Sequence, residues 1–181
     1  QSENFREDPF TSYSFAKVAI CHLLQMLYKT EKFPAVIIRL FLVYGPNQNK
    51  ERFLPNIIKK IINNEKLSIS PGEQIRDYCY ITDVVDAIFL TFNNEQTYGE
   101  VINIASGNSI KIKKVVETVI NFLKKGNVEY GGISYRENES MELVADIKKA
   151  NQILNWKPKI SFKEGLEKTI LWYQNNKSVS Y

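Results

Sequence analysis

The 181-residue chain has little of what metal sites and membrane anchors require. It contains two cysteines, one histidine and no Cys-x-x-Cys pair, so it offers no ligand set for a structural zinc ion. Cys21 and Cys79 have apolar or aromatic neighbours and are expected to be buried free thiols. The longest apolar stretches are too short to span a bilayer and no signal peptide is present, which points to a cytoplasmic protein without a membrane partner.

The distribution of charge argues against a nucleic-acid partner, and the spacing of the glycines argues against a loop that binds a dinucleotide pyrophosphate. The formal net charge is +4, but the lysines are spread along the sequence and no basic stripe with interleaved aromatic residues occurs, so no nucleic-acid partner is expected. None of the eight glycines forms Gly-x-x-Gly-x-x-Gly or Gly-x-Gly-x-x-Gly. The loop that cradles a dinucleotide pyrophosphate is therefore absent from this chain. With 44% hydrophobic residues, the chain is still long enough to bury the core of one domain or slightly more.

Among the residues that are present, Tyr13 and Lys17 form a candidate acid/base pair. They stand in the first turns of a helix that the sequence predicts to run to about Thr30, opened by a Thr or Ser cap. Four-residue spacing stacks them one turn apart, so the lysine charge favours the ionised phenol and Tyr13 can pass protons near neutral pH. The alternative is a tyrosine that packs at the helix start beside a lysine that reaches along it to solvent.

The same Tyr-x-x-x-Lys spacing occurs twice more, and position has to choose among the three pairs. Tyr28 and Lys32 lie where the helix is expected to stop, just before Pro34. Tyr173 and Lys177 fall in a polar tail. Neither pair is expected to face a pocket, which leaves Tyr13 and Lys17.

Alternating helix and strand patterns predict an α/β fold. After the first helix, residues 35–41 form an almost continuous apolar run, typical of a parallel strand covered on both faces. Residues 42–47 should form a loop at its carboxyl end, where open α/β sheets bind their ligands. The other expected elements are helices at 53–63, 82–92, 112–123, 146–154 and from 162 onward, strands at 67–70, 75–81 and 101–104, and an exposed loop at 124–132.

Four groups of residues, taken in their order along the chain, indicate the function. They are Tyr13-Ser14-Phe15-Ala16-Lys17; Arg39-Leu40-Phe41 with Tyr44-Gly45-Pro46; Gly72-x-x-x-Arg76-Asp77-Tyr78-x-Tyr80-Ile81-x-Asp83; and Trp156-Lys157-Pro158 leading into residues 165–173. In this order they resemble the extended short-chain dehydrogenases/reductases, the nucleotide-sugar epimerase, dehydratase and ketoreductase family. The resemblance covers essentially the whole chain and is strongest to the 4-ketoreductase and epimerase branch that includes the CDP-abequose synthases.

The resemblance implies the carboxyl-terminal part of a doubly wound, Rossmann-like parallel sheet with a smaller α/β substrate-binding region. Residues 1–50 would form the last β/α units of the NAD(P)-binding domain. Residues 51–181 would mainly bind the nucleotide-sugar, with 75–107 partly returning to the main sheet. The family's catalytic Ser or Thr lies further before the tyrosine than the twelve residues available here. We therefore expect a fragment of a longer enzyme, associating as a homodimer or through an uncovered sheet edge.

The resemblance also implies roles for individual residues in the amino-terminal part. Tyr13 would be the catalytic acid/base, and Lys17 would hold the nicotinamide ribose hydroxyls while favouring the ionised tyrosine. The four residues after the first strand would line the nicotinamide of NAD or NADP. These four residues are Phe41, Leu42, Val43 and Tyr44.

For the substrate, the resemblance implies that Arg76 and Arg136 bind the diphosphate, because planar guanidinium groups fit phosphate oxygens. Two alternatives remain open, since either arginine could be an ordinary surface residue and Arg76 could pair with Asp77. Asp83 is expected to cap a helix rather than to bind substrate. Leu42 stands where many relatives carry a substrate-contacting asparagine, which leaves the substrate class open.

These features favour a fragment of an NAD(P)-dependent nucleotide-sugar epimerase or 4-ketoreductase that acts on an NDP-hexose or deoxyhexose. A second hypothesis is an NDP-sugar 4,6-dehydratase. A third is a non-catalytic half domain that binds a nucleotide-sugar or a partner protein. The first two need the tyrosine–lysine pair, whereas the third explains the missing glycine loop without it.

Overall fold

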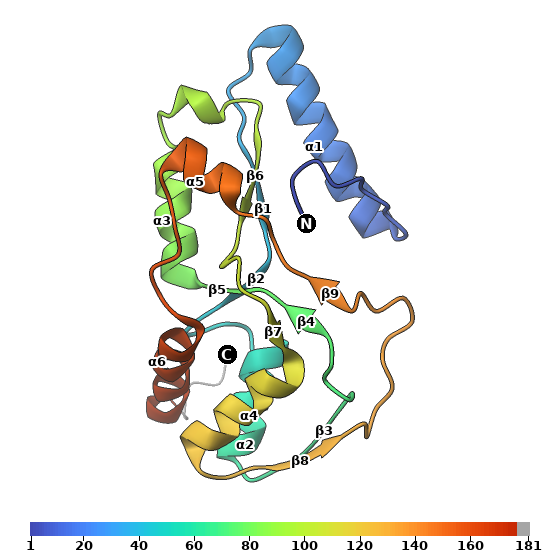
Figure 1. Cartoon of the computed structure of the whole chain (residues 1–181), viewed down its shortest axis with the longest axis vertical. Coiled ribbons are helices and arrows are strands. Elements are labelled where there is room, and N and C mark those ends of the chain that lie inside the picture. Colours follow the sequence, from blue (N-terminus) through green and yellow to red (C-terminus); the bar gives the residue numbers. More distant parts are fainter. Residues whose placement is uncertain (177–181) are drawn as a thin grey trace.

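Short strands and helices alternate along residues 1–176, the part of the chain that the computed structural model describes (Figure 1). In chain order they are α1 (Ser12–Glu31), β1 (Ile37–Leu40), β2 (Leu42–Tyr44), α2 (Phe53–Ile62), β3 (Lys66–Ile69), β4 (Ile75–Arg76), β5 (Tyr78–Tyr80), α3 (Ile81–Thr91), the 3₁₀ turn η1 (Glu95–Thr97), β6 (Val101–Ile104), β7 (Ile110–Lys111), α4 (Ile112–Leu123), β8 (Asn127–Tyr130), β9 (Glu142–Leu143), α5 (Lys148–Leu154) and α6 (Phe162–Asn175). None of the helices described here is long and apolar enough to cross a membrane.

Most strand pairs are parallel, as the helix–strand alternation predicts. The pairs β1–β6, β2–β5 and β3–β8 are all parallel. Strand β4 lies between β7, which is antiparallel to it, and β9, which is parallel. Parallel strands need long crossover connections, which the intervening helices supply. This arrangement confirms the predicted α/β class.

Two hydrophobic cores hold the helices against these strands. In the larger core, α2 presents Leu54, Ile57, Ile58 and Ile61 on one face, the spacing that an amphipathic helix requires. This face packs with the apolar faces of α4 and α6 and with strands β2, β3 and β5. The smaller core gathers α3, α5 and β6 around Trp156. Together these cores fix the β2–β5 pair between the two halves of the molecule (Figure 1).

Helix α6 crosses the β2–β5 pair closely because a glycine faces it. A Cβ added to Gly165 would lie 2.3 Å from the Tyr44 hydroxyl oxygen, so no larger residue fits there without movement. The Tyr44 hydroxyl donates a hydrogen bond to the backbone oxygen of Phe162 at 3.1 Å. Ser161 opens the helix by accepting a hydrogen bond from the Glu164 backbone N–H at 3.3 Å, in agreement with the predicted cap.

Three segments differ from the pattern that the sequence suggests. Residues 42–47 are not entirely loop, because Leu42–Tyr44 pairs with β5 as strand β2. The expected strand at 75–81 is divided at Asp77, whose buried side chain binds backbone groups outside the strands. The expected exposed loop at 124–132 contains β8, which pairs with β3. In all three segments, contacts between residues far apart in the sequence determine the secondary structure.

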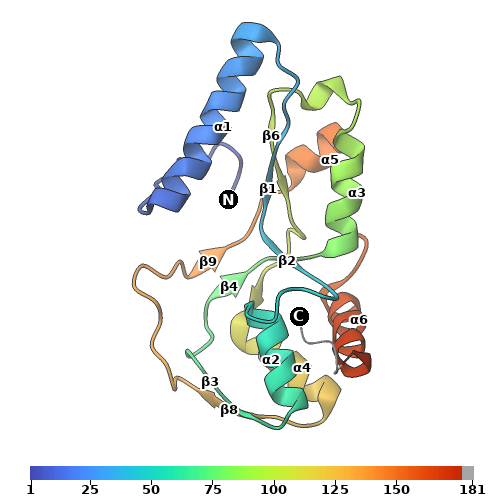
Figure 2. The same cartoon turned by 180° about the vertical axis from the view of Figure 1, so that it is seen from behind.

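The first strand is less covered than its apolar sequence predicts. Among the described residues, β1 pairs only with β6, and of its four residues only Ile37 is buried. Leu40 is 49% exposed. Helix α1 has no buried residue and stands apart from the strands in both views (Figures 1 and 2). The expectation that this strand is covered on both faces is therefore wrong for the described chain.

The uncovered side of α1 leads to an association prediction. Large apolar side chains on this helix are exposed, among them Phe15, Ile20, Leu23 and Met26. Clustered exposed apolar surface favours association. We expect the chain to form dimers or larger species in light scattering, and Leu23→Glu to shift it toward monomer. Leu171→Glu, at an exposed leucine of α6, should leave the mass unchanged. A wild-type chain that stays monomeric across concentrations would contradict this prediction.

Candidate functional site

Tyr13 and Lys17 lie side by side in the first turns of α1, as their spacing predicts. A reciprocal capping box holds the start of the helix: Thr11 Oγ1 accepts from the Ser14 N–H and Ser14 Oγ from the Thr11 N–H, both at 3.0 Å. The Lys17 Nζ atom lies 5.5 Å from the centroid of the Tyr13 ring, and the Tyr13 side chain is 72% exposed. The phenol is thus accessible and has a cation beside it.

The geometry of this pair does not by itself distinguish it from its nearest competitor. Lys32 Nζ lies 5.4 Å from the Tyr28 ring centroid, almost the same distance. Tyr28, however, packs against Gly99, where an added Cβ would lie 2.0 Å from a ring carbon. Its ring therefore supports the fold, whereas Tyr13 is free to meet a ligand. Lys177, of the third pair, lies outside the described residues.

A cleft of about 450 Å³ lies beside the start of α1. Its walls are Gln1, Ser2 and residues 5–9 of the amino-terminal segment, Ser14 and Val18 of α1, Arg39, Phe41, Asn103, and Leu143 of β9. We call it the α1 cleft. Ser14 is the chain neighbour of Tyr13, although neither Tyr13 nor Lys17 lines the cleft. Phe41, expected to line the nicotinamide, is one of its wall residues.

Arg39 secures the amino-terminal segment over this cleft. Its Nη1 donates to the Glu3 backbone oxygen at 3.1 Å, and its Nη2 forms an ion pair with Glu7. Across the sheet from Arg39 in register, Asn103 donates through its side chain to the Gln1 backbone oxygen at 3.2 Å. Arg39 of the Arg39-Leu40-Phe41 group thus acts as an anchor for residues 1–7 in this structure.

Arg76 lies on β4. The neighbouring strand β9 contains Leu143, which lines the α1 cleft. Arg76 and Leu143 are direct partners in the β4–β9 register. The Arg76 guanidinium forms an ion pair with Glu139, and the two side chains are only 11% and 19% exposed. Its Nη1 also donates to the Ile75 backbone oxygen at 2.9 Å. An anionic ligand that takes this guanidinium must displace the Glu139 carboxylate.

Arg136 lies in the segment between β8 and β9, close in the chain to Glu139. Its backbone oxygen accepts a hydrogen bond from the Glu139 N–H at 3.1 Å, which makes a tight turn. The Arg136 side chain is exposed, and within residues 1–176 it forms no hydrogen bond or ion pair. The turn therefore brings Arg136 into the neighbourhood of Arg76 through Glu139, and its role in binding phosphate stays a prediction.

Asp77 does not pair with Arg76, so that alternative is wrong. Its carboxylate is fully buried and accepts hydrogen bonds from Ser106 N and Oγ (2.8 and 2.6 Å), from Gly107 N (3.0 Å) and from Ala145 N (3.2 Å). It joins the end of β6 to the segment after β9. Local sequence patterns do not indicate this role, because the two bound segments are about thirty and seventy residues away.

Asp83 has a comparable role and is not the predicted helix cap. Helix α3 begins at Ile81 and has no side-chain cap. The buried Asp83 carboxylate instead accepts from the backbone N–H groups of Lys159 at 3.1 Å and Ile160 at 3.0 Å. Its backbone oxygen accepts from the Trp156 indole N–H at 3.1 Å. Asp83 therefore holds the segment that leads into α6.

The residues that follow β1 have different surroundings. Phe41, Leu42 and Val43 are half-buried, whereas the Tyr44 ring is buried beneath α6. Burial raises the pKa of Tyr44, so its phenol stays protonated and serves as the donor to α6. Any contact of Tyr44 with a cofactor would have to come from its backbone. Contacts of all four residues with a nicotinamide stay predictions.

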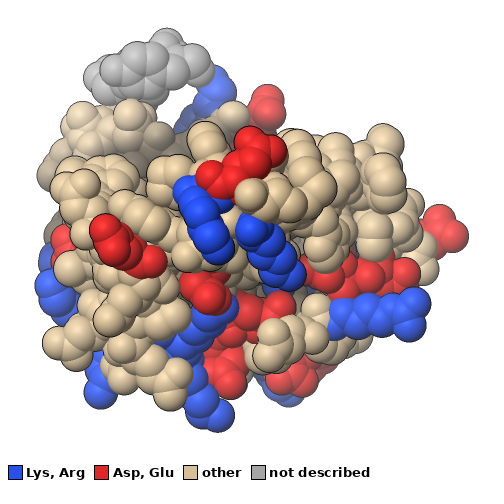
Figure 3. All heavy atoms as spheres, turned by 90° about the horizontal axis from the view of Figure 1, so that it is seen from above, with Lys and Arg blue, Asp and Glu red and all other residues tan. Residues whose placement is uncertain are grey.

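The Cys79 thiol does not form a second reactive centre. Burial, together with the charges of Asp83 and Asp77, raises the pKa of the Cys79 thiol to about 12, so it is not a nucleophile near neutral pH. Residues 1–176 contain no group of three or more His, Cys, Asp or Glu side chains arranged to hold a metal ion. On the face in Figure 3, basic side chains lie among acidic side chains and uncharged residues.

Comparisons with known proteins give one consistent result. Residues 1–169 match the family described as GDP-mannose 4,6-dehydratase. The dTDP-D-glucose 4,6-dehydratase of Bos taurus is 33% identical over 180 residues, which are 96% of this chain and 50% of the relative. The chain spans about half the length of the curated relatives it matches.

Solved structures agree with the sequence relatives. The dTDP-glucose 4,6-dehydratase of Bacillus anthracis, in complex with NAD, superimposes with a TM-score of 0.88 at 28% identity, over 97% of this chain and 56% of the other. The UDP-glucose 4-epimerase of Thermotoga maritima, with UDP-glucose, gives 0.90 at 25% identity, over 98% and 58%. Both dehydratases and epimerases thus share this fold.

Proposed function

Because the chain belongs to the GDP-mannose 4,6-dehydratase family of NAD-dependent epimerases and dehydratases, we propose that it supplies the acid/base pair and the substrate-binding part of a nucleotide-sugar 4,6-dehydratase. The substrate would be an NDP-hexose. Tyr13 is the acid/base residue, Lys17 orients the cofactor ribose, and Arg76 and Arg136 bind the diphosphate.

One observation carries the proposal. The α1 cleft is lined by Ser14, the chain neighbour of Tyr13, by Phe41 and by Leu143, the strand partner of Arg76, although these residues are far apart in the sequence. Proton transfer and anion binding are the two tasks that a nucleotide-sugar enzyme needs at neighbouring points. The largely buried guanidinium of Arg76 is already held by a carboxylate, so the position is suited to a negative charge.

The described residues fit the nicotinamide end of the cofactor and not its pyrophosphate, for which this chain has no glycine loop. When bound, NAD would supply hydride transfer: a hydride would leave C4 of the sugar and, after water is lost across C5 and C6, would be returned to C6. Tyr13 would take the proton from the C4 hydroxyl at its phenolic oxygen, and C4 would remain a ketone in the product. Lys17, one turn along the helix, would place a positive charge beside the phenol and hold hydroxyl groups of the ribose.

The relatives favour a dehydratase over the 4-ketoreductase that the sequence motifs suggest. The relatives reported above are 4,6-dehydratases and a 4-epimerase. A 4-epimerase is the second candidate, because it would use the same tyrosine for oxidation and reduction at one carbon. The product distinguishes the two activities: a dehydratase yields a 4-keto-6-deoxy sugar, and an epimerase returns a sugar of unchanged mass.

Arg76→Ala tests the binding half of this proposal. We expect it to weaken the binding of dTDP-glucose or UDP-glucose to the chain, measured by calorimetry, by roughly 10- to 150-fold, the equivalent of about 1.5–3 kcal/mol for a charge-assisted hydrogen bond. Arg76→Lys should recover only part of the affinity, because an ammonium keeps the charge and loses the two-pronged geometry.

Arg52→Ala is the matched control, since Arg52 is an exposed arginine at the start of α2. It should leave nucleotide-sugar affinity unchanged. If Arg76→Ala binds both nucleotide-sugars as well as the wild type does but unfolds at lower urea concentration, Arg76 has a structural role and the diphosphate assignment fails.

A further inference from the structure

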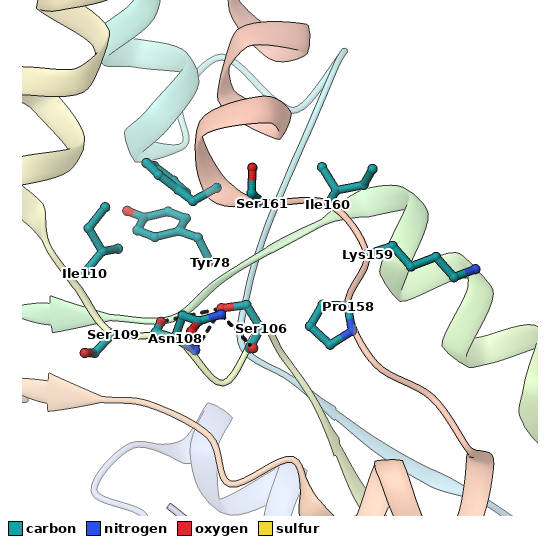
Figure 4. Close-up of a pocket in the computed structure, with 10 residues that line it drawn as sticks. Tyr78, Ser106, Asn108, Ser109, Ile110, Pro158, Lys159, Ile160 and Ser161 are labelled. Carbon is teal, nitrogen blue, oxygen red and sulfur yellow. Dashed lines mark hydrogen bonds between the residues drawn. The ribbon is translucent and has the colours of Figure 1, made fainter.

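A second cavity, of about 460 Å³, lies away from the α1 cleft, in the size range of small-molecule sites. We call it the Tyr78 pocket. Three segments line it: Tyr78 of β5, the loop 106–110 between β6 and β7, and residues 158–162 at the start of α6 (Figure 4). None of the residues assigned to the proposed reaction lines it. In Figure 1, α6 and α1 lie on opposite sides of the β2–β5 pair, so the two cavities are separate.

The Tyr78 hydroxyl is the feature that makes this cavity a candidate binding site. The residue is only 6% exposed, and its ring packs edge-on against Tyr44 and at 50° against Phe162. Within residues 1–176, every fully enclosed side-chain polar atom has a hydrogen-bond partner, yet no bond of the Tyr78 hydroxyl is present. The hydroxyl must therefore be open to the pocket that its side chain lines. Figure 4 shows it at the side where Ser109 and Ile110 lie.

The walls of this pocket are already fixed before any ligand enters. The Asp77 carboxylate holds the backbone N–H groups of Ser106 and Gly107, and the Asp83 carboxylate holds those of Lys159 and Ile160. Both carboxylates are buried, and their negative charge is stabilised by these backbone N–H donors. Binding here would cost little ordering of loops, because the two loops are preorganised.

The lining is neutral in charge and mixed in polarity. Lys159 is the one charged residue that lines the pocket, and its ammonium is held 2.9 Å from the Asp86 carboxylate. Burial raises the pKa of Tyr78, so its phenol remains an uncharged donor. The lining combines hydroxyl and amide groups from Ser106, Asn108 and Ser109 with the apolar side chains of Ile110, Pro158, Ile160 and Phe162.

We propose that the Tyr78 pocket binds a small uncharged ligand that carries hydroxyl groups on an apolar frame, such as a pyranose sugar without phosphate. The Tyr78 hydroxyl donates a hydrogen bond to one ligand oxygen. The Ser109 hydroxyl and the side-chain oxygen of Asn108 bind others, since the Ser106 hydroxyl already donates to Asp77, and the apolar walls contact the C–H face of the ring. The site is distinct from the nucleotide-sugar site and does not depend on the proposed function.

The test is an amide NMR titration of the whole chain with methyl α-D-glucopyranoside. We expect saturable shifts confined to the amides of residues 106–110 and 159–162. Tyr78→Phe keeps the ring packing and should weaken binding roughly 2- to 13-fold, the loss of one neutral hydrogen bond. Tyr130→Phe, on β8, should have no effect. Arg76→Ala should also leave these shifts unchanged, which separates this site from the proposed function.

Ser109→Trp keeps the test decisive if Tyr78→Phe does not fold. Ser109 is exposed on the loop, so a tryptophan there is tolerated by the fold while its side chain fills the pocket and should abolish the shifts. The proposal is overturned if the glucoside shifts no amide in either segment, if the shifts survive Ser109→Trp, or if sodium phosphate produces the same shifts.

Discussion

Replacing Tyr13 by phenylalanine should lower turnover of the active enzyme that contains this chain by roughly 10²- to 10⁴-fold, the usual contribution of a general acid/base group. The change removes the phenolic proton donor and leaves the ring, so the contact of Lys17 with the ring face can persist. KM for the nucleotide-sugar should change little, because the diphosphate is held elsewhere. The measurement is steady-state kinetics on dTDP-glucose and UDP-glucose.

Tyr28→Phe provides the control within the same helix. Tyr28 has the same spacing to a lysine and the same ring-to-ammonium distance, to within 0.1 Å (5.4 against 5.5 Å). It should retain the wild-type rate. Equal rates for the wild type, Tyr13→Phe and Tyr28→Phe would show that Tyr13 only packs at the helix start, and the acid/base assignment would be lost.

The largest stability effect is expected at Asp77. Its carboxylate accepts four hydrogen bonds from two other segments, residues 106–107 and Ala145, so Asp77→Ala would leave several buried or partly buried N–H and O–H donors without partners. Each such donor costs about 1–3 kcal/mol, and partial access of water to the loop offsets some of that. We expect the free energy of unfolding to fall by about 2–4 kcal/mol, measured by urea denaturation followed by circular dichroism.

Asp86→Ala is the control for this variant. Asp86 forms an exposed ion pair with Lys159 at 2.9 Å, and such pairs contribute about 0–1 kcal/mol. Its loss should therefore be hard to detect in the same assay. If Asp77→Ala were as stable as Asp86→Ala, the buried carboxylate would not be holding the three segments together.

Local patterns predict those parts of the fold whose interactions are local. The cap and length of α1 and the positions of α2 and α6 follow from residues a few positions apart, and the structure agrees with them. The division of the strand at Asp77 and the pairing of β8 with β3 depend on partners sixty or so residues away. Single-sequence patterns contain no record of such partners.

The same distinction applies to the candidate site. The spacing of Tyr13 and Lys17 predicts their contact because both lie on one helix. The partner of Arg76 could not be predicted, since Glu139 reaches it through the turn that follows Arg136. The exposed state of β1 was also missed, because an apolar strand sequence does not say whether the described chain supplies its cover.

The Glu139 carboxylate would make Arg76 selective among anions if this arginine binds the diphosphate as proposed. A carboxylate tethered to the same chain competes for the guanidinium at an effective concentration that dilution of the protein cannot lower. A singly charged anion would gain little affinity, because it replaces one ion pair with another of equal charge. A group with two negative charges close together would bind more tightly, because it brings more charge than the carboxylate it displaces. The Arg76–Glu139 ion pair would thus favour diphosphates over singly charged anions.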